Sequence, residues 1–254
     1  MPAKTNDFKA ALLRGEQLIG LWMGLGSSSA TELCAHAGFD WVLIDGEHGP
    51  NDVLTILDQL RAIQGAASAP VVRAPSDDRV LLKRLLDIGA RSLLIPMIES
   101  GDQAAEAVRS VRYPPQGVRG VGASLARASN FGAIPDYLAT ANDQICLLLQ
   151  VESRAGIDAL DDILAVEGVD GVFVGPADLA ADMGFTGRPG APEVQAVVVE
   201  TLKRIQAAGK ASGILTSDRA LAKGYADLGV GFLAVGSDVG VLGAGLRALK
   251  AEFS

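Results

Sequence analysis

The most constraining feature of this sequence is a regular alternation of short apolar runs with longer stretches of helical spacing. Eight runs rich in Val, Ile and Leu are each bounded by polar or glycine-containing turns; they span residues 18–25, 40–45, 70–74, 92–97, 145–152, 171–175, 211–215 and 232–236. Runs of this length and composition are typical of strands that are buried on both faces, as in a parallel sheet covered by helices.

The segments between the runs predict the covering helices. Helical spacing of apolar residues occurs over residues 29–37, 52–64, 77–88, 102–111, 157–166, 191–208 and 217–228. Several of these segments begin at Ser or Asp and end at Gly, as helices do. Eight strand–helix units in 254 residues predict an α/β protein, a (β/α)₈ TIM barrel forming one domain over residues 1–254. An open, doubly wound sheet is the alternative.

Composition narrows the classes of partner. The net charge of -8 and the pI of about 4.8 give no general attraction to nucleic acid or anionic lipid. No uninterrupted apolar stretch is long enough to span a membrane, and the N-terminus does not resemble a secretion signal. Cys34 and Cys146 lie in apolar surroundings, which suits buried, reduced thiols and a cytoplasmic protein. No dinucleotide or Walker-type motif is present, so no nucleotide cofactor is expected.

One interval breaks the regular spacing. Residues 112–143, rich in Gly, Pro and Arg, lie between the fourth and fifth runs. Loops of this length are usually functional, and we expect this one to emerge at the face of the barrel where the chemistry occurs. The alternative is a surface excursion or a subunit contact.

In such a barrel, the residues that follow the strands line the active-site mouth. Glu152 and Asp178 come from neighbouring strands, so their carboxylates can hold a hard divalent cation such as Mg²⁺ or Mn²⁺. His48 follows Asp45 by three residues, and a turn can bring the Asp45 carboxylate to the imidazole, giving a base with its orienting partner. A histidine that only caps a turn is the alternative.

Further candidates surround these residues. Arg73 is a charge within a buried run, where it either binds an oxo-acid or enolate or forms a core salt bridge to Asp45 or Glu152. Gly175 and Pro176 end a strand, and a helix beginning near Ala177 can offer free backbone N–H groups to a carboxylate. The remaining strand-end candidates for substrate binding are Trp22, Gln150 and Leu215. The lysines lie in the N-terminus, in predicted helices or just before a run, so no Schiff-base lysine is expected.

Six motifs make the chain similar to the HpcH/HpaI family of class II pyruvate aldolases. They are WVLIDGEHGP at 41–50, VVRAP at 71–75, LLIPMIES at 93–100, YPPQGVRGVG at 113–122, LLLQVESRAGI at 147–157 and GVFVGPADLA at 171–180. The resemblance implies a barrel of the phosphoenolpyruvate/pyruvate type and a reversible aldol reaction between pyruvate, or a close 2-oxoacid such as hydroxypyruvate, and an aldehyde. It also implies a divalent metal, Mg²⁺, Mn²⁺ or Co²⁺, and a homo-hexamer whose subunits exchange helices.

The resemblance assigns a role to each motif. Glu152 and Asp178 match the metal carboxylates, and Arg73 matches the arginine that holds the pyruvyl oxygen and the enolate. His48 with Asp45 matches the acid/base histidine and its partner. Trp22 matches a site-lining aromatic residue, and Gly175 with Ala177 matches the turn that receives the pyruvate carboxylate. Two alternatives remain: a metal-dependent acyl-CoA lyase of the citryl or malyl type on the same barrel, and a non-catalytic, metabolite-binding barrel.

Overall fold

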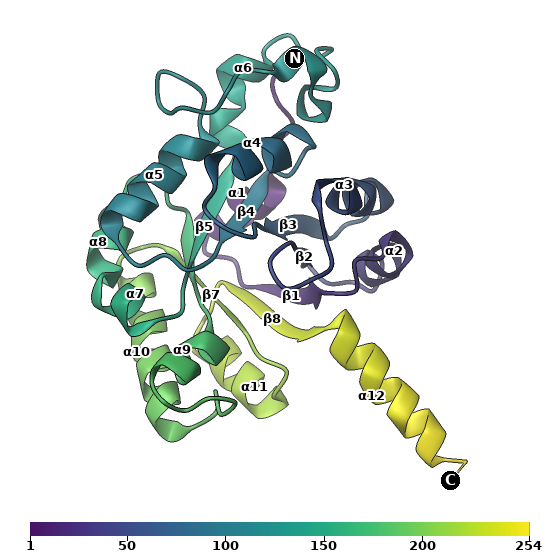
Figure 1. Ribbon diagram of the computed structural model, residues 1–254, viewed down its shortest axis with the longest axis vertical. Helices are drawn as coiled ribbons and strands as arrows, with labels where there is room; N and C mark the ends of the chain where they lie inside the picture. The colour runs from purple at the N-terminus through teal and green to yellow at the C-terminus, as the bar shows by residue number, and fades with distance from the viewer. Residues whose placement is uncertain (254) are drawn as a thin grey trace.

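The structure is a computed structural model that describes residues 1–253. Eight parallel strands form its centre (Figure 1): β1 (Leu18–Met23), β2 (Trp41–Asp45), β3 (Ala69–Arg73), β4 (Ser92–Ile95), β5 (Cys146–Val151), β6 (Gly171–Val174), β7 (Ala211–Leu215) and β8 (Phe232–Ser237). Each strand pairs with the next, and β8 pairs with β1, with Leu18 opposite Phe232. The sheet is therefore a closed barrel, and the open-sheet alternative is wrong. Every predicted run matches a strand to within two residues at either end.

The predicted helices are present, but one of them is divided and three further helices occur that were not predicted. The helices are α1 (Asp7–Leu13), α2 (Ser28–Ala35), α3 (Val53–Ala62), α4 (Arg79–Asp87), α5 (Gly101–Val111), α6 (Tyr137–Thr140), α7 (Arg154–Asp158), α8 (Leu160–Ala165), α9 (Pro176–Asp182), α10 (Pro192–Ala207), α11 (Arg219–Asp227) and α12 (Asp238–Ala251). The segment 157–166, expected to be one helix, is divided at Ala159, which ends α7 and precedes α8. The helices α1, α6 and α12 were not expected.

The strands are buried on both faces because their side chains alternate between two apolar layers. Leu43 and Leu148 point into the barrel, where they join a cluster with Phe8 of α1, whereas their neighbours Ile44 and Leu149 pack outward against the helices. Two glycines are required inside: a Cβ at Gly20 would lie 2.1 Å from the ring of Trp41, and Gly213 meets Phe232 in the same way. The barrel interior is therefore filled by side chains, and this leaves the strand ends for a site.

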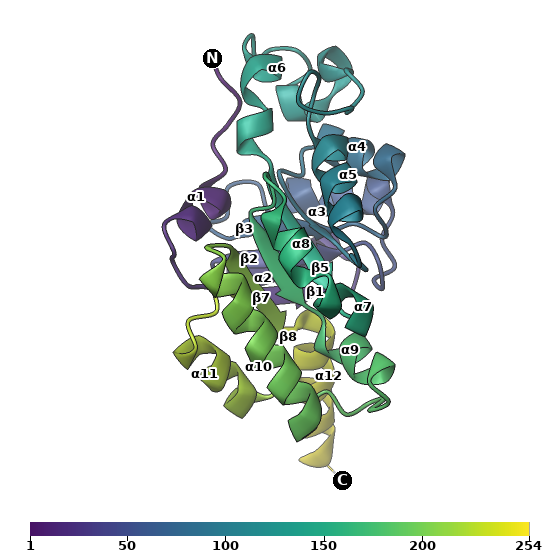
Figure 2. The same cartoon turned by 90° about the vertical axis from the view of Figure 1, so that its left-hand side faces the viewer.

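The long segment 112–143 lies at the opposite end of the barrel from the place we expected. Because it follows α5 and precedes β5, it is a helix-to-strand connection and reaches the amino end of the strands. It packs against the start of the chain: the Ala3 N–H donates to Thr140 Oγ1 at 2.8 Å, and the N-terminal amine lies 3.2 Å from Asp136. Figure 2 shows the N-terminus beside α6. The expectation of a loop at the chemical face is wrong, which leaves the alternative of a surface excursion or a subunit contact.

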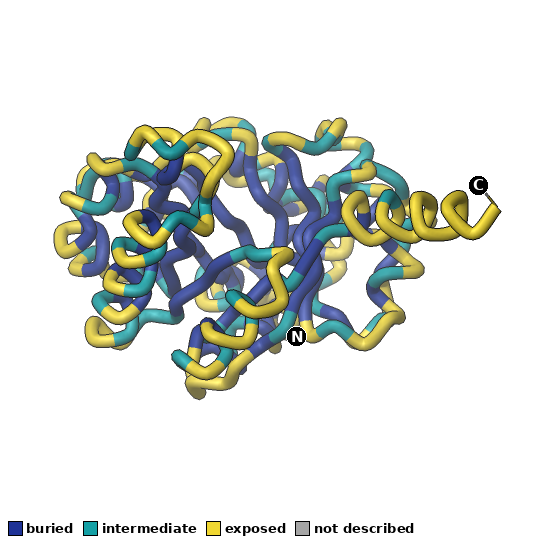
Figure 3. The backbone as a smooth tube through the Cα atoms, turned by 90° about the horizontal axis from the view of Figure 1, so that it is seen from below, coloured by how far each residue is buried: buried dark blue, intermediate teal, exposed yellow. Residues whose placement is uncertain are grey.

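The last helix, α12, projects away from the barrel (Figure 1). Nearly all of it is exposed, as Figure 3 shows, although its sequence is apolar. Val241, Leu242, Leu246 and Leu249 are each more than half exposed. An apolar surface of this kind is unusual on a monomeric protein. None of the helices in the described chain combines the length and apolarity that crossing a membrane requires.

Candidate active site

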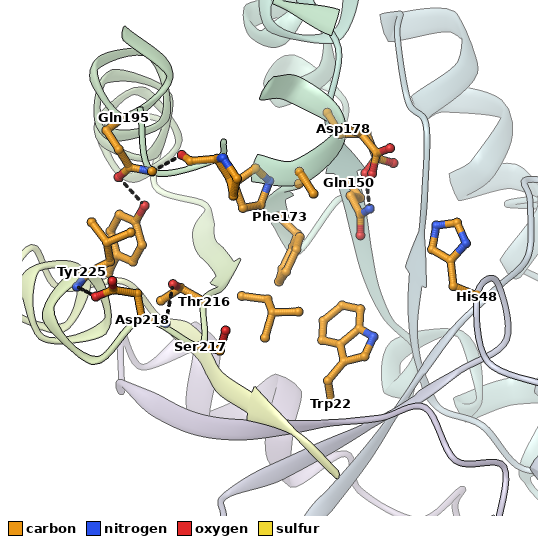
Figure 4. Close-up of a pocket in the computed structure, with 18 of the residues that line it drawn as sticks. Trp22, His48, Gln150, Phe173, Asp178, Gln195, Thr216, Ser217, Asp218 and Tyr225 are labelled. Atoms are coloured by element: carbon orange, nitrogen blue, oxygen red, sulfur yellow. Dashed lines mark hydrogen bonds between the residues drawn. The ribbon is translucent and has the colours of Figure 1, made fainter. Parts of the chain in front are cut away.

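A cavity of about 490 Å³ opens at the carboxyl ends of the strands, as expected for a barrel of this type. The predicted site residues line it, with the exception of Asp45, which lies behind Arg73: they are Trp22, His48, Arg73, Gln150, Glu152, Gly175, Pro176, Ala177, Asp178 and Leu215. Figure 4 shows His48, Gln150 and Asp178 on one side of the cavity and Gln195, Tyr225 and Asp218 on the other, with Trp22 and Phe173 between them. Residues far apart in the sequence therefore share one site.

Arg73 and Asp45 form a buried ion pair at the ends of β3 and β2. The two residues are register partners, and the Arg73 Nε and Nη2 donate to the two carboxylate oxygens of Asp45 at 2.9 and 2.6 Å. Both residues are at least nine-tenths buried. The core salt bridge that we considered for Arg73 is therefore present. Arg73 also lines the cavity, so the same guanidinium pairs with Asp45 and is available to a ligand.

Asp45 is held from several sides. Trp22 Nε1 donates to its Oδ2 at 3.0 Å, and the backbone N–H groups of Glu47 and His48 donate to its Oδ1 at 3.0 and 3.3 Å. Burial by itself raises the pKa of Asp45, but the hydrogen bonds from Arg73 and Trp22 outweigh burial, and the pKa lies below its usual value. Asp45 is therefore a charged carboxylate that fixes Arg73, Trp22 and the turn after β2.

The expected contact between the Asp45 carboxylate and the His48 imidazole is replaced in the structure by a contact between Asp45 and the His48 backbone. Asp45 binds the backbone N–H of His48, because its carboxylate is already occupied by Arg73 and Trp22. The imidazole itself is 68% exposed, and its Nε2 lies 4.0 Å from Oε2 of Glu47. His48 lines the cavity as predicted, but Glu47 is its acidic neighbour.

Glu47 is a site residue to which the sequence assigned no role. Its Oε2 lies 2.6 Å from Arg73 Nη1, and its side chain is mostly buried. Burial raises the pKa of Glu47 above its usual value, against the attraction of Arg73. The available signal was its position between Asp45 and His48 in the IDGEH motif.

Glu152 directly follows β5, and its buried carboxylate accepts hydrogen bonds from two groups. Its Oε1 accepts the backbone N–H of Met97 at 3.0 Å, and its Oε2 accepts a hydrogen bond from Gln150 Nε2. A Cβ at Gly175 would lie 2.3 Å from Oε2, so only glycine permits this placement. Burial, and to a smaller extent the nearby charges of Asp178 and Glu47, together raise the pKa of Glu152 to about 7, against the hydrogen bonds from Gln150 and Met97.

Asp178 completes the acidic side of the cavity. It lies in the first turn of α9, which begins at Pro176, so the strand-end turn and the helix start predicted near Ala177 are confirmed. Asp178 is exposed toward the cavity, whereas Glu152 is 3% exposed. Within residues 1–253, no cluster of three or more His, Cys, Asp or Glu residues has the arrangement of a metal cage. A cation held here would therefore have few protein ligands and would keep positions for other oxygen donors.

The sequence model of the HpcH/HpaI aldolase/citrate lyase family matches residues 18–244. The chain belongs to this family. The match runs from β1 into α12, so every strand that contributes to the cavity lies within the HpcH/HpaI region.

Relatives of known name span the whole chain. The hydroxypyruvate/pyruvate aldolase of Roseovarius nubinhibens is 55% identical over 253 residues, which cover 100% of this chain and 98% of that protein. The 4-hydroxy-2-oxo-heptane-1,7-dioate aldolase of Escherichia coli is 56% identical over 248 residues, covering 98% and 95%. The crystal structure of an HpcH/HpaI aldolase/citrate lyase family protein from Burkholderia cenocepacia superposes with a TM-score of 0.93 at 46% identity, covering 98% and 100%.

Proposed function

We propose that this protein is a divalent-metal-dependent class II aldolase. It catalyses the reversible aldol reaction between pyruvate, or a close 2-oxoacid such as hydroxypyruvate, and an aldehyde. The observation that carries the proposal is the placement of Arg73, Glu152 and Asp178 around one cavity at the mouth of the barrel. Relatives that are 55–56% identical over nearly the full chain are named aldolases, which supports the same reaction class.

The acidic side of the cavity fits a hard divalent cation such as Mg²⁺, Mn²⁺ or Co²⁺. Glu152 is buried, and its pKa is raised to about 7 because no nearby positive charge offsets the burial of its carboxylate. The buried Oε1 of Gln150 has no hydrogen-bond partner among the described residues, so a second oxygen beside Glu152 is also without a partner. Glu152 and Asp178 would hold the cation. When bound, the metal would supply a positive charge that polarises the 2-oxo group and favours its enolate.

Each residue then has a defined task in the cleavage of a 4-hydroxy-2-oxoacid. His48 takes the proton of the C4 hydroxyl as the C3–C4 bond breaks and the aldehyde leaves. The electron pair of that bond passes to the pyruvyl unit as an enolate, and the Arg73 guanidinium stabilises the negative oxygen. Asp45 keeps Arg73 in place through two hydrogen bonds. Transfer of that proton from His48 to C3, through a water molecule, then gives pyruvate and restores the neutral imidazole, and aldol addition is the reverse.

Two parts of the cavity suit the two reactants. The turn at Gly175, Pro176 and Ala177 begins α9 and lies beside Glu152, and we assign the pyruvate carboxylate to its backbone. Trp22 and Leu215 face the remaining space and form an apolar surface for the aldehyde, and Gln150 positions Glu152 through its amide. The segment 112–143 contributes no residue to the described cavity, so the aldehyde contacts that we expected from it are not part of the proposal.

The exposed apolar side chains of α12 support an oligomeric assembly. These leucine and valine side chains need a covering surface, and we propose that α12 packs against a second copy of the chain within a homo-hexamer. We also propose that residues 1–254 form one domain, because β1 and β8 close a single barrel. Cys34 and Cys146 are free thiols and Cys146 is buried, which supports a cytoplasmic protein.

Two alternatives are less well supported. An acyl-CoA lyase of the citryl or malyl type shares the enolate chemistry, but Arg73 is the single Lys or Arg among the described residues that line the cavity, and the CoA phosphates favour a cluster of such cations. A non-catalytic, metabolite-binding barrel could hold a ligand with the same side chains, but the relatives that are 55–56% identical over nearly the full chain are named aldolases.

Hydrogen exchange at pyruvate tests the proposed function without knowledge of the aldehyde. Proton NMR follows the methyl signal of pyruvate in D₂O, first with metal-stripped protein and then after addition of Mg²⁺ or trace Mn²⁺. We expect metal-dependent loss of the signal, which Arg73→Ala removes. Absence of exchange with Mg²⁺, Mn²⁺ and Co²⁺ would overturn the proposal.

A further inference from the structure

A hydrogen-bonded bridge joins three elements on the side of the cavity opposite His48. Gln195, in the second turn of α10, donates from Nε2 to the backbone carbonyl of Pro189 at 2.8 Å. The hydroxyl of Tyr225, on α11, donates to Oε1 of the same amide at 2.6 Å. Both hydrogen bonds are drawn in Figure 4. One amide therefore links the α9–α10 connection to the neighbouring helix.

The Tyr225 side of the bridge is buried in the protein core. Tyr225 is only 3% exposed and packs in the apolar layer between the strands and the helices. Burial raises the pKa of its hydroxyl, so the group stays protonated and acts as the donor. Its bond fixes the amide of Gln195 with Oε1 toward Tyr225, which leaves Nε2 to face the Pro189 carbonyl.

The connection between α9 and α10, which the bridge holds, is anchored at its two ends, where Phe185 and Ala191 pack against the main apolar cluster, and it is exposed between them. The connection after α9 contains Gly184 and Gly187 at positive φ and is largely exposed. Its own backbone contributes only short turns, such as the bond from the Arg188 N–H to the Phe185 carbonyl at 2.9 Å. Exposed segments with few buried contacts open at low free-energy cost. Pro189 and Gly190 nevertheless line the cavity, so an exposed connection forms part of its wall.

This wall borders the part of the cavity that pyruvate does not need. The charged groups Arg73, Glu152 and Asp178 account for a small anion and its cation, whereas Leu221, Thr216 and Ser217 line the space beside the bridge. Figure 4 shows Thr216, Ser217, Gln195 and Tyr225 together, away from His48 and Asp178. The space beside the bridge is therefore available for the substituent of the aldehyde, whose carbonyl group lies within reach of His48.

We propose that Gln195 and Tyr225 are positioning residues that hold the Pro189–Gly190 wall and thereby set the affinity of the site for the aldehyde. This inference rests on the proposed aldolase function and extends it to the acceptor side of the cavity. Neither residue takes part in enolate formation. Their loss therefore changes aldehyde binding and leaves the pyruvate half of the reaction in place.

Two variants break the bridge with small changes of shape. Tyr225→Phe removes only the hydroxyl, and Gln195→Met keeps the length of the side chain without its polar atoms. With glycolaldehyde as acceptor and Mg²⁺ present, we expect the aldehyde KM to rise about 3- to 10-fold in each, the effect of a lost hydrogen bond. The double variant should be no worse than the stronger single one, because both changes break one bridge. Metal-dependent exchange of the pyruvate methyl protons should stay within twofold of the wild type.

Gln206→Ala is the matched control. Gln206 lies on α10 too, and its Nε2 donates to the backbone carbonyl of Gly229 at 3.1 Å, outside the cavity. This variant should leave the aldehyde KM unchanged even if it lowers the melting temperature. Hydrogen–deuterium exchange read by mass spectrometry supplies a measurement independent of activity, because peptides covering residues 184–191 should exchange faster in Gln195→Met and not in Gln206→Ala.

The outcomes separate the two levels of inference. An aldehyde KM within twofold of wild type in both bridge variants would overturn the positioning role while the aldolase function stood. Equal exchange of residues 184–191 in wild type and variants would do the same. A wild-type protein that neither exchanges pyruvate protons nor forms aldol product would overturn the proposed function, and with it the role of this wall.

Discussion

Asp45 and Arg73 face each other at the ends of neighbouring strands and are joined by two hydrogen bonds, of 2.9 and 2.6 Å. The guanidinium of Arg73 faces the cavity, and its third nitrogen, Nη1, lies 2.6 Å from Oε2 of Glu47. A charge held in advance by its own protein needs no reorganisation when a negative oxygen develops beside it.

Replacing Arg73 should stop the chemistry. Arg73→Ala removes the fixed positive charge from the developing enolate, and we expect kcat to fall at least about 100-fold, the usual effect of losing one such donor. Steady-state kinetics of aldol cleavage measure this. The control is Arg154→Ala, which removes an exposed ion pair with Asp182. A near-normal kcat in Arg73→Ala would contradict the assigned role.

His48 and Asp45 should differ in what their loss affects. His48→Ala should lower aldol turnover about 100-fold or more, because the proton of the C4 hydroxyl loses its acceptor. Since the imidazole is 68% exposed, the free energy of unfolding should change by less than about 0.5 kcal/mol. Urea unfolding and kinetics on the same sample test both statements. Full turnover in a folded His48→Ala protein would exclude the proton-transfer role.

The stability of the protein should depend on the charge of Asp45. Its pKa is lower in the folded state, so the ion pair contributes fully above the ordinary pKa of a free aspartate and is lost as the pH falls through the lowered value. Asp45→Asn should cost about 3 kcal/mol near neutral pH, because Arg73 stays buried without its main partner. Urea unfolding from pH 3 to pH 7 should show the variant losing less stability on acidification than the wild type. Parallel curves would contradict this explanation.

Cation binding should stabilise the protein through Glu152 and Asp178. For metal-stripped protein, Mn²⁺ at 100 times its Kd should raise the free energy of unfolding by about 2.7 kcal/mol. Glu152→Gln and Asp178→Asn should reduce this gain, and calorimetry should show that Glu152→Ala no longer binds Mn²⁺. Asp182→Asn, at the far end of α9, is the control. Unchanged Mn²⁺ affinity in the Glu152 variants would place the cation elsewhere.

The assembly should depend on α12. Leu242→Asp combined with Leu246→Asp places two charges on its exposed apolar surface. We expect the molar mass from light scattering to fall from that of a hexamer to that of smaller species, while Arg247→Ala on the same helix leaves it unchanged. A wild-type monomer would contradict the proposed assembly.

Several features were predictable from the sequence because local chemistry determines them. Buried strands are short apolar runs, and several helices begin after a Ser or Asp cap, such as Ser27 and Asp52. The position of the 112–143 segment was also within reach, since a helix was predicted at 102–111 and the segment therefore leads back to the amino end of a strand. The helix α12 was missed because Gly240, Gly243 and Gly245 weaken its helical signal.

The sequence alone determined the order of strands and helices, and it identified the strand-end residues that could meet at a barrel mouth. Only the tertiary structure decided the closure of β8 on β1, the choice of Arg73 and Trp22 as partners of Asp45, and the placement of Glu47 beside His48. The physical reason is that a side chain's periodicity is set by its own segment, whereas its hydrogen-bond partner is set by competition among groups brought together from distant segments. Asp45 has two oxygens, and a neighbouring strand's guanidinium and an indole N–H occupy them more favourably than the imidazole three residues away.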